Sequence, residues 1–163
     1  SLAKNSEGSK AFRIGRSALD SANTEGHRWG TLMPQYTSIV TILVVLFYFF
    51  IATRVPLARR AFNVQLPAIT GHPDFERVFR VHQNTLEWMP IFLPSLWLCA
   101  IYLSDAAAAA TGVAWIVGRA LYYVGYARQV QKRLPGFLIQ SIACFLLIVG
   151  AIVGMAMRFG TSP

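Results

Sequence analysis

The sequence predicts an all-α integral membrane protein, a four-helix bundle of up-down topology. Apolar residues make up 55% of the 163-residue chain and charged residues only 13%, whereas a soluble domain carries about 25% charged residues. The apolar residues gather in four stretches, and each is long enough to cross a hydrocarbon core of about 30 Å. Charged and polar side chains recur inside these stretches. Such groups persist at membrane depth mainly where they face a polar cavity or a partner.

The charge balance is basic, with 15 Lys and Arg against 7 Asp and Glu and a net charge of +8. Nucleic-acid-binding proteins show such a balance, but the arginines here cluster at helix ends and inside apolar helices, so we expect no nucleic acid partner. Cys99 and Cys144 lie in apolar runs, which is typical of buried small side chains. The histidines His27, His72 and His82 are scattered, and the sequence therefore predicts no metal site.

The chain divides into a polar N-terminal arm, residues 1–35, and a membrane domain, residues 36–160. A polar arm of this length is normally disordered unless another surface holds it. We therefore expect the arm to pack against its own oligomer or against another membrane subunit. Membrane lipid is expected to surround the membrane domain.

The expected helices cover residues 36–53, 74–103, 106–134 and 137–159. Arg54 is expected to end the first helix, and the pair Pro135-Gly136 to break the chain between the third and the fourth. Pro90 and Pro94 lie inside the second helix and should kink it, which membrane helices tolerate when neighbours satisfy the freed backbone groups.

Basic residues predict the orientation of the helices. They gather in the connection between the first and second helices and in the connection between the third and fourth, as Arg54, Arg59, Arg60, Arg128, Lys132 and Arg133. Cytoplasmic connections of membrane proteins carry an excess of Lys and Arg, so both connections are expected in the cytoplasm and both termini on the far side. Basic residues of the arm run against this assignment, and most of them lie beyond the reach of the rule.

Two rows of polar side chains are the candidate site. Arg80, Asn84 and Glu87 are spaced i, i+4 and i+7, so they lie within about 40° of each other on a helix. The same geometry places a second row on the third helix, comprising Arg119, Tyr122, Tyr126 and Arg133. Both rows occupy the cytoplasmic ends of their helices and are expected to face each other.

Surplus positive charge around these rows indicates an anionic ligand. The simpler alternative is a structural ion pair between Arg80 and Glu87, with other arginines extended to the membrane surface. Arginines outnumber carboxylates in this region, however. Headgroup phosphates can neutralise part of the excess. A small peptide with two carboxylates also fits, because arginine binds carboxylates through two parallel hydrogen bonds. Glu87 would then hold the ammonium group of the peptide, and Asn84 its backbone.

Three segments resemble the membrane-associated proteins in eicosanoid and glutathione metabolism, the MAPEG family. They are ARRAFNV (58–64), PDFERVFRVHQNTLEWMPIF (73–92) and YYVGYARQVQKR (122–133). The resemblance extends in order and spacing over about residues 36–160 and excludes the N-terminal arm. It implies a homotrimer of four-helix protomers, with glutathione held between neighbouring protomers near the cytoplasmic face.

The resemblance also implies roles for individual residues. By position, glutathione is expected to contact Arg80, His82, Asn84, Glu87, Trp88, Arg119, Tyr122 and Tyr126. Arg133 matches an arginine that stabilises the glutathione thiolate, and Arg60 a basic residue near the thiol. Tyr126 is the alternative hydrogen-bond donor to the sulfur. Trp88 departs from the tyrosine of the leukotriene-forming branch and lacks its hydroxyl.

The function implied is a glutathione transferase or peroxidase, in which an ionised thiol attacks an apolar electrophile or a lipid hydroperoxide. Glutathione is the co-substrate. The alternative is a non-catalytic member of the family, either a lipid-binding protein or a structural subunit of a larger membrane complex, since a fold does not by itself secure an activity. A transporter is less consistent with the sequence, because the four helices show no internal repeat.

Overall fold

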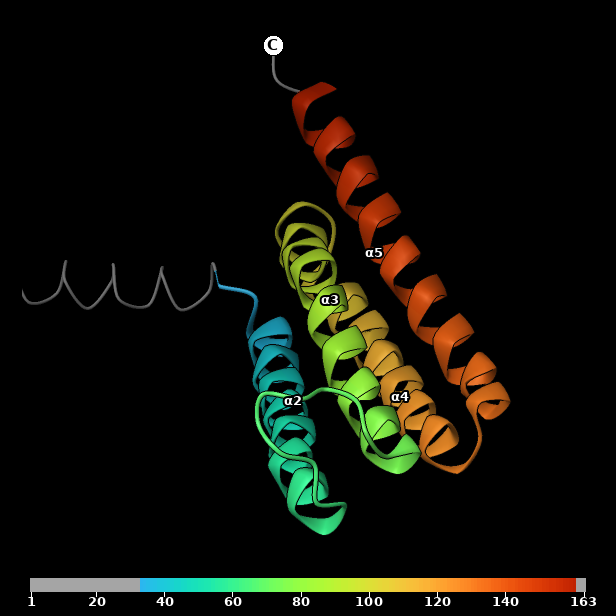
Figure 1. Ribbon diagram of the computed structural model, residues 1–163. Helices are drawn as coiled ribbons and strands as arrows, with labels where there is room; N and C mark the ends of the chain where they lie inside the picture. Colours follow the sequence, from blue (N-terminus) through green and yellow to red (C-terminus); the bar gives the residue numbers. More distant parts are fainter. Residues whose placement is uncertain (1–32, 161–163) are drawn as a thin grey trace, which may run out of the picture. The chain divides into compact units, whose positions relative to one another are not determined.

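The computed structural model describes residues 33–160. Within this range the helices are α2 (Gln35–Ala61), α3 (Pro73–Tyr102), α4 (Asp105–Arg128), the 3-10 helix η1 (Val130–Arg133) and α5 (Leu134–Gly160) (Figure 1). This part of the chain contains no strand, so its predicted all-α class is confirmed. The four α-helices are each long and apolar enough to cross a membrane. The expected arm, residues 1–35, lies outside the described residues except for its last three.

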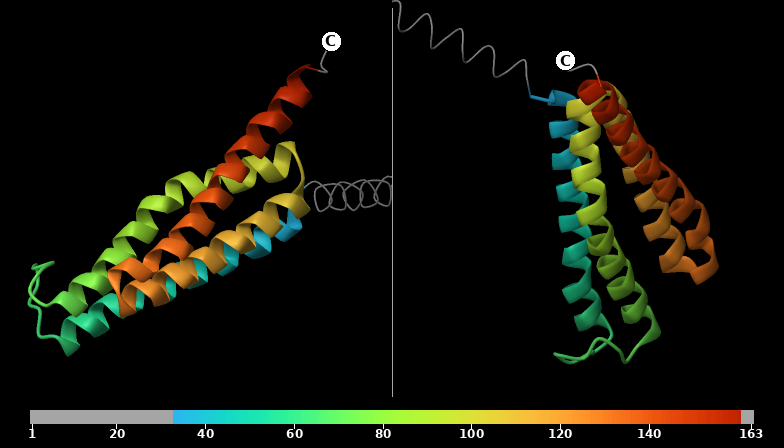
Figure 2. Two further views of the ribbon diagram at one scale, coloured as in Figure 1. Left: turned by 90° about the vertical axis from the view of Figure 1, so that its right-hand side faces the viewer. Right: turned by 90° about the horizontal axis from the view of Figure 1, so that it is seen from above.

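The two central helices of the bundle are α3 and α4. Each contacts the other and both of the outer helices, α2 and α5, which lie on opposite sides of the central pair (Figures 1 and 2). Phe92 of α3 and Trp115 of α4 stack at the centre of the core, with ring centroids 4.0 Å apart. Both side chains are fully buried. Cys99 and Cys144 are also buried and carry free thiols, as the sequence predicts.

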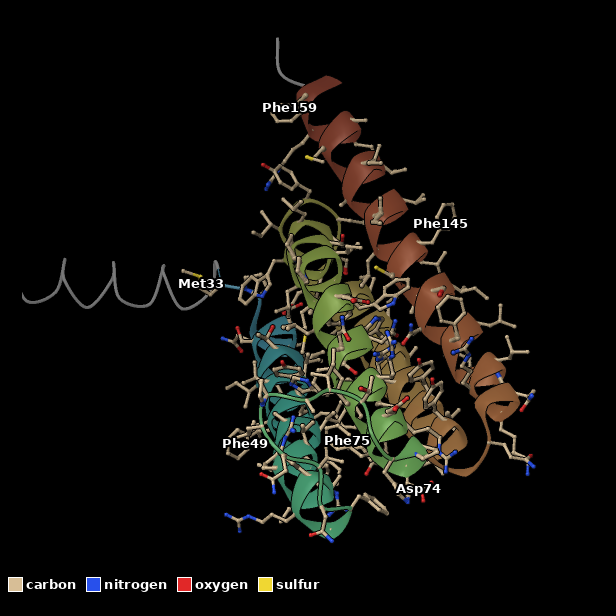
Figure 3. All side chains as sticks on the ribbon, in the orientation of Figure 1. Met33, Phe49, Asp74, Phe75, Phe145 and Phe159 are labelled. Atoms are coloured by element: carbon tan, nitrogen blue, oxygen red, sulfur yellow. The ribbon has the colours of Figure 1, made fainter. Side chains whose placement is uncertain are left out.

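The outer faces of the bundle are apolar. Phe49 on α2 and Phe145 on α5 are 66% and 64% exposed and point away from the core (Figure 3). Phe75, in contrast, is fully buried and lies between α2 and α3 (Figure 3). Exposed apolar surface of this extent indicates contact with lipid or with another chain.

The first helix is longer than the sequence predicts. We expected it to end at Arg54, but α2 continues through Pro56 to Ala61. A proline inside a helix removes one backbone hydrogen bond. Packing offsets that loss here, because Ala58 lies beyond the proline and is buried against Val64 and Phe75.

The end of α2 is closed by a Schellman motif. Asn63 adopts a positive φ of 53°, and the amide of Val64 donates to the carbonyl of Arg59 at 3.1 Å, which is the 6→1 bond of this motif. The guanidinium of Arg59 then donates to the carbonyl of Ala68 at 2.7 Å. These bonds fix the connection between α2 and α3.

The beginning of α2 is capped by a residue from a distant part of the chain. The carboxylate of Asp105, the first residue of α4, accepts hydrogen bonds from the amides of Tyr36 and Thr37 at 3.0 and 2.9 Å. The first amides of a helix lack partners within the helix. Asp105 satisfies two of them for α2, while Ser104 caps α4 through the amide of Ala107.

The connection between α4 and α5 also differs from the prediction. The third helix was expected to reach residue 134, but α4 ends at Arg128 and η1 follows it. The pair Pro135-Gly136, expected to break the chain, lies instead in the first turn of α5. Proline is favourable there, since the amide it lacks would have no partner within the helix.

Gly136 brings α5 against the backbone of α4. A β-carbon at this position would lie 2.6 Å from the carbonyl oxygen of Gly118 and inside contact distance of the backbone of Tyr122. Only a residue without a side chain permits this approach. The contact holds the start of α5 beside the tyrosines of α4.

We predict that Gly136→Ala destabilises the bundle by about 1–3 kcal/mol, because the new methyl group forces the two helices apart. Thermal unfolding in detergent, followed by circular dichroism, measures the change. Gly160→Ala is the matched control, since a β-carbon there meets no atom within 4 Å. Equal unfolding temperatures for the two variants would contradict the close approach of α4 and α5.

Candidate functional site

A polar cavity of about 300 Å³ opens between α3, α4 and η1. Its lining residues are Arg80, Gln83, Asn84, Glu87, Tyr122, Tyr126 and Arg133. Six of these seven residues are predicted site residues, and Gln83 is the one that sequence reasoning missed. Gln83 lies three residues after Arg80 on the same helix face. Its spacing in the sequence therefore already indicated that it would line the same cavity.

The α3 side of the cavity is the row predicted from helical periodicity. Arg80, Asn84 and Glu87 all line it, because α3 runs unbroken from Pro73 to Tyr102. The row therefore presents a guanidinium, an amide and a carboxylate to one space. A helix holds such groups more rigidly than a loop does.

The α4 side of the cavity is a pair of stacked tyrosines. Tyr122 and Tyr126 have ring centroids 5.7 Å apart and an interplanar angle of 19°. The guanidinium carbon of Arg133 lies 5.4 Å from the ring centroid of Tyr126, and that of Arg119 lies 4.6 Å from Tyr122. Cations at these distances are attracted to the faces of aromatic rings, so the tyrosine pair carries a guanidinium at each end.

The structure corrects the position of Arg133 in the chain. The prediction put this residue on the same helix as Arg119, but α4 ends before it and Arg133 lies on η1. It still lines the cavity, since η1 turns back beside the last turns of α4. The 3-10 helix η1 thus brings Arg133 to the cavity, where a continuous third helix was expected to place it.

Positive charge exceeds negative charge at the cavity. Arg80, Arg133 and Glu87 line it and are exposed, while Arg119 lies buried behind the wall. Asp74 forms ion pairs with Arg77 and His72. Within residues 33–160 Arg80 and Glu87 do not pair with each other, and the structural ion pair considered from the sequence is not formed.

Arg119 is predicted to bind the ligand but is not among the residues that line the cavity. It is 1% exposed and donates to Asn84 at 3.2 Å, to Gln140 at 2.5 Å and to Thr85 at 2.6 Å. Asn84 therefore stands between Arg119 and the cavity. Thr85 and Gln140 belong to the site as partners of Arg119, and sequence reasoning did not single them out.

Three other predicted site residues lie away from the cavity. Position 82 is about 200° around the helix from position 80, and His82 accordingly faces α2. Its Nε2 atom is 3.0 Å from the hydroxyl of Tyr48. Trp88 packs against the central core and meets Phe137 edge to face, with centroids 6.1 Å apart.

Arg60 is exposed near the end of α2 and lines a separate hollow of about 500 Å³ beside the connection to α3. Its neighbour Arg59 is held by carbonyl groups of that connection. The described chain therefore does not bring Arg60 to the polar cavity.

The helices and the cavity together define a membrane protein of several spans with a charged cavity between its helices. The model of the MAPEG family matches residues 37–153. The chain belongs to the MAPEG family.

Individual relatives cover most of the same region. An uncharacterized protein of Synechocystis is 42% identical over 120 residues, which are 74% of this chain and 88% of the relative. Leukotriene C4 synthase of Bos taurus is 39% identical over 120 residues, covering 74% of this chain and 80% of the relative. Human microsomal glutathione S-transferase 2 is 40% identical over 121 residues, covering 74% and 82% respectively. The resemblance inferred from the three sequence segments is confirmed.

Proposed function

We propose that the protein is a membrane-bound glutathione transferase that ionises the thiol of glutathione for attack on apolar electrophiles. The observation that carries the proposal is the surplus of guanidinium groups around a cavity between helices. Relatives named leukotriene C4 synthase and microsomal glutathione S-transferase 2 support it.

The lining residues suit the functional groups of glutathione. The tripeptide carries two carboxylates, one ammonium group and a thiol. Arg80 offers a fork of donors to a carboxylate, and Glu87 an acceptor to the ammonium group. Asn84 and the hydroxyls of Tyr122 and Tyr126 supply neutral hydrogen bonds. A cavity of about 300 Å³ lies at the small end of the range for ligand pockets.

Arg133 is the residue we assign to thiolate stabilisation. A free thiol has a pKa of about 8.5, and a nearby guanidinium can lower the pKa of an acidic group by about 1 to 3. Arginine stays protonated at any relevant pH. A fixed cation beside the sulfur therefore keeps more of the thiol ionised at neutral pH. Tyr126, which lies under Arg133, is the alternative donor to the sulfur.

The reaction needs no nucleophile from the protein. The thiol proton leaves to water, and the sulfur lone pair forms a bond to the electrophilic carbon. The leaving group departs with its bonding pair, or an epoxide oxygen takes a proton. With a lipid hydroperoxide, the thiolate attacks the outer oxygen, so that an S–O bond forms, the O–O bond breaks, and the alkoxide takes a proton from water to leave as an alcohol. The sulfur product is the sulfenic acid of glutathione. A second glutathione then forms the disulfide and water.

We further propose that three copies assemble as a homotrimer, with the helices crossing the membrane in alternating directions and both basic connections in the cytoplasm. The exposure of Arg80, Glu87 and Arg133 in a single chain supports a neighbouring copy as the missing wall of the site. In this assembly Arg60 is assigned to the site of an adjacent copy, because its own chain directs it elsewhere. His82 and Trp88 stay proposed ligand contacts, and in a single chain they face Tyr48 and the central core.

The alternative function is a non-catalytic subunit that binds lipid or another membrane protein. Its support in the sequence is the N-terminal arm, residues 1–35, of which the structure describes only the last three. Both predicted rows of polar side chains contribute residues to the cavity, which favours the enzyme over the non-catalytic subunit.

A direct test is the ultraviolet absorbance of the thiolate. Adding glutathione to the purified oligomer at neutral pH should increase this absorbance, and S-methylglutathione, which has no ionisable thiol, should not. Calorimetry on the same samples measures binding. Binding without a thiolate signal would favour the non-catalytic alternative, and no binding would exclude glutathione as the ligand.

Arg133→Ala should lower turnover about 100-fold, the cost of losing one preorganised charge contact, while the Kd for glutathione changes much less. Without the cation, the pKa of the bound thiol returns toward its free value. The rate of the variant should therefore keep rising with pH above the point where the wild-type rate has levelled. Lys132→Ala is the control, because Lys132 is exposed on the same turn but does not line the cavity.

Native mass spectrometry of the protein in detergent should give the mass of three chains. A monomer that still binds glutathione with full affinity would show that no neighbouring copy completes the site. The proposed assembly would then be wrong, while the assignment of the ligand would stand.

A further inference from the structure

Arg119 is a buried charge that has no carboxylate partner among the described residues. Its guanidinium is 1% exposed, and its hydrogen-bond acceptors are the side-chain oxygens of Asn84, Thr85 and Gln140. All three acceptors are neutral. Burying a charge without pairing is costly, so an arginine held this way indicates a specific structural demand.

The three acceptors come from two helices that both pack against α4. Asn84 and Thr85 lie on α3, and Gln140 lies on α5. The hydroxyl of Thr85 donates to the carbonyl of Val81 at 2.7 Å and is therefore oriented to accept from Arg119 at 2.6 Å. Arg119 is thus held in a clamp of acceptors from both α3 and α5.

The clamp determines which way Asn84 faces. A guanidinium only donates hydrogen bonds, so the amide oxygen of Asn84 must be the atom that meets it. The amide nitrogen is then directed away from Arg119. Asn84 lines the cavity and Arg119 does not, so this nitrogen is the group available to a ligand there.

We infer that Arg119 is a positioning residue, which Thr85 and Gln140 hold in place so that Asn84 presents its amide N–H groups to the cavity. The inference rests on the proposed function, since glutathione is the ligand that would receive those hydrogen bonds. It assigns Thr85 and Gln140 to the site. Arg119 then acts through Asn84 and does not itself contact the ligand.

The test compares isosteric substitutions on α3. Thr85→Val removes the acceptor but keeps the shape, and it should weaken glutathione binding about tenfold, as expected for a lost hydrogen bond to a charged group. Thr85→Ser keeps the hydroxyl and should restore the affinity. Turnover at saturating glutathione should change little, because Arg133 is untouched.

The matched control for Thr85→Val is Ser95→Ala. Ser95 is also buried on α3, and its hydroxyl donates to the carbonyl four residues earlier, that of Ile91, at 2.7 Å. The control thus removes the same kind of intrahelical bond without touching Arg119. Its affinity for glutathione should equal that of the wild type.

Gln140→Met removes the acceptor that α5 provides to Arg119. It tests the inference if a variant of α3 fails to fold. It should weaken binding in the same direction as Thr85→Val. Thermal unfolding of each variant shows whether the bundle is intact at the temperature of the binding measurement.

A double-mutant cycle with Asn84→Ala decides whether the clamp acts through Asn84. In that background Thr85→Val and Gln140→Met should cost no further affinity, since the group they position is gone. Additive losses would overturn the inference, as would unchanged affinity for both single variants. If the wild type binds no glutathione, the proposed function fails and the inference fails with it. If the wild type binds and only the cycle fails, the proposed function stands.

Discussion

The structure depends on the burial of one arginine in an apolar bundle. Removing an ion from water costs several kcal/mol even after the surroundings relax, and the described chain repays this at Arg119 with three neutral oxygens from α3 and α5. Those oxygens must all lie within hydrogen-bonding distance of one guanidinium. The relative placement of α3, α4 and α5 is therefore constrained at the depth where the polar cavity opens, and the cavity wall inherits that constraint.

The rest of the site follows from the way α4 and α5 meet. Because Gly136 lets the start of α5 lie on the backbone of α4, the turn before it brings Arg133 to the face of Tyr126. The two tyrosines then form a continuous aromatic wall between a buried and an exposed cation. The Arg119 end of this wall is buried and the Arg133 end is exposed.

Much of the fold and the site was predictable because its signals are local. Apolar runs predicted the helices, and i, i+4 spacing brought Arg80, Asn84 and Glu87 together. Where the signals are not local, the prediction failed. The first predicted helix did not end at Arg54 but continues through Pro56, since a long-range contact of Ala58 outweighs the hydrogen bond that the proline removes. The sequence of residues 129–133 predicts a continuous helix. The structure has a turn there because α5 packs back against α4. The partners of Arg119 depend on the register between helices, which no single segment encodes.

The cap on α2 has a consequence for the order of events at the membrane. The amide of Thr37 is satisfied by a carboxylate 68 residues further along the chain, and chains are made from the N-terminal end. Until α4 has been made, the leading amides of α2 lack this acceptor. The cap on α2 therefore forms only after α4 has been made and has packed against α2.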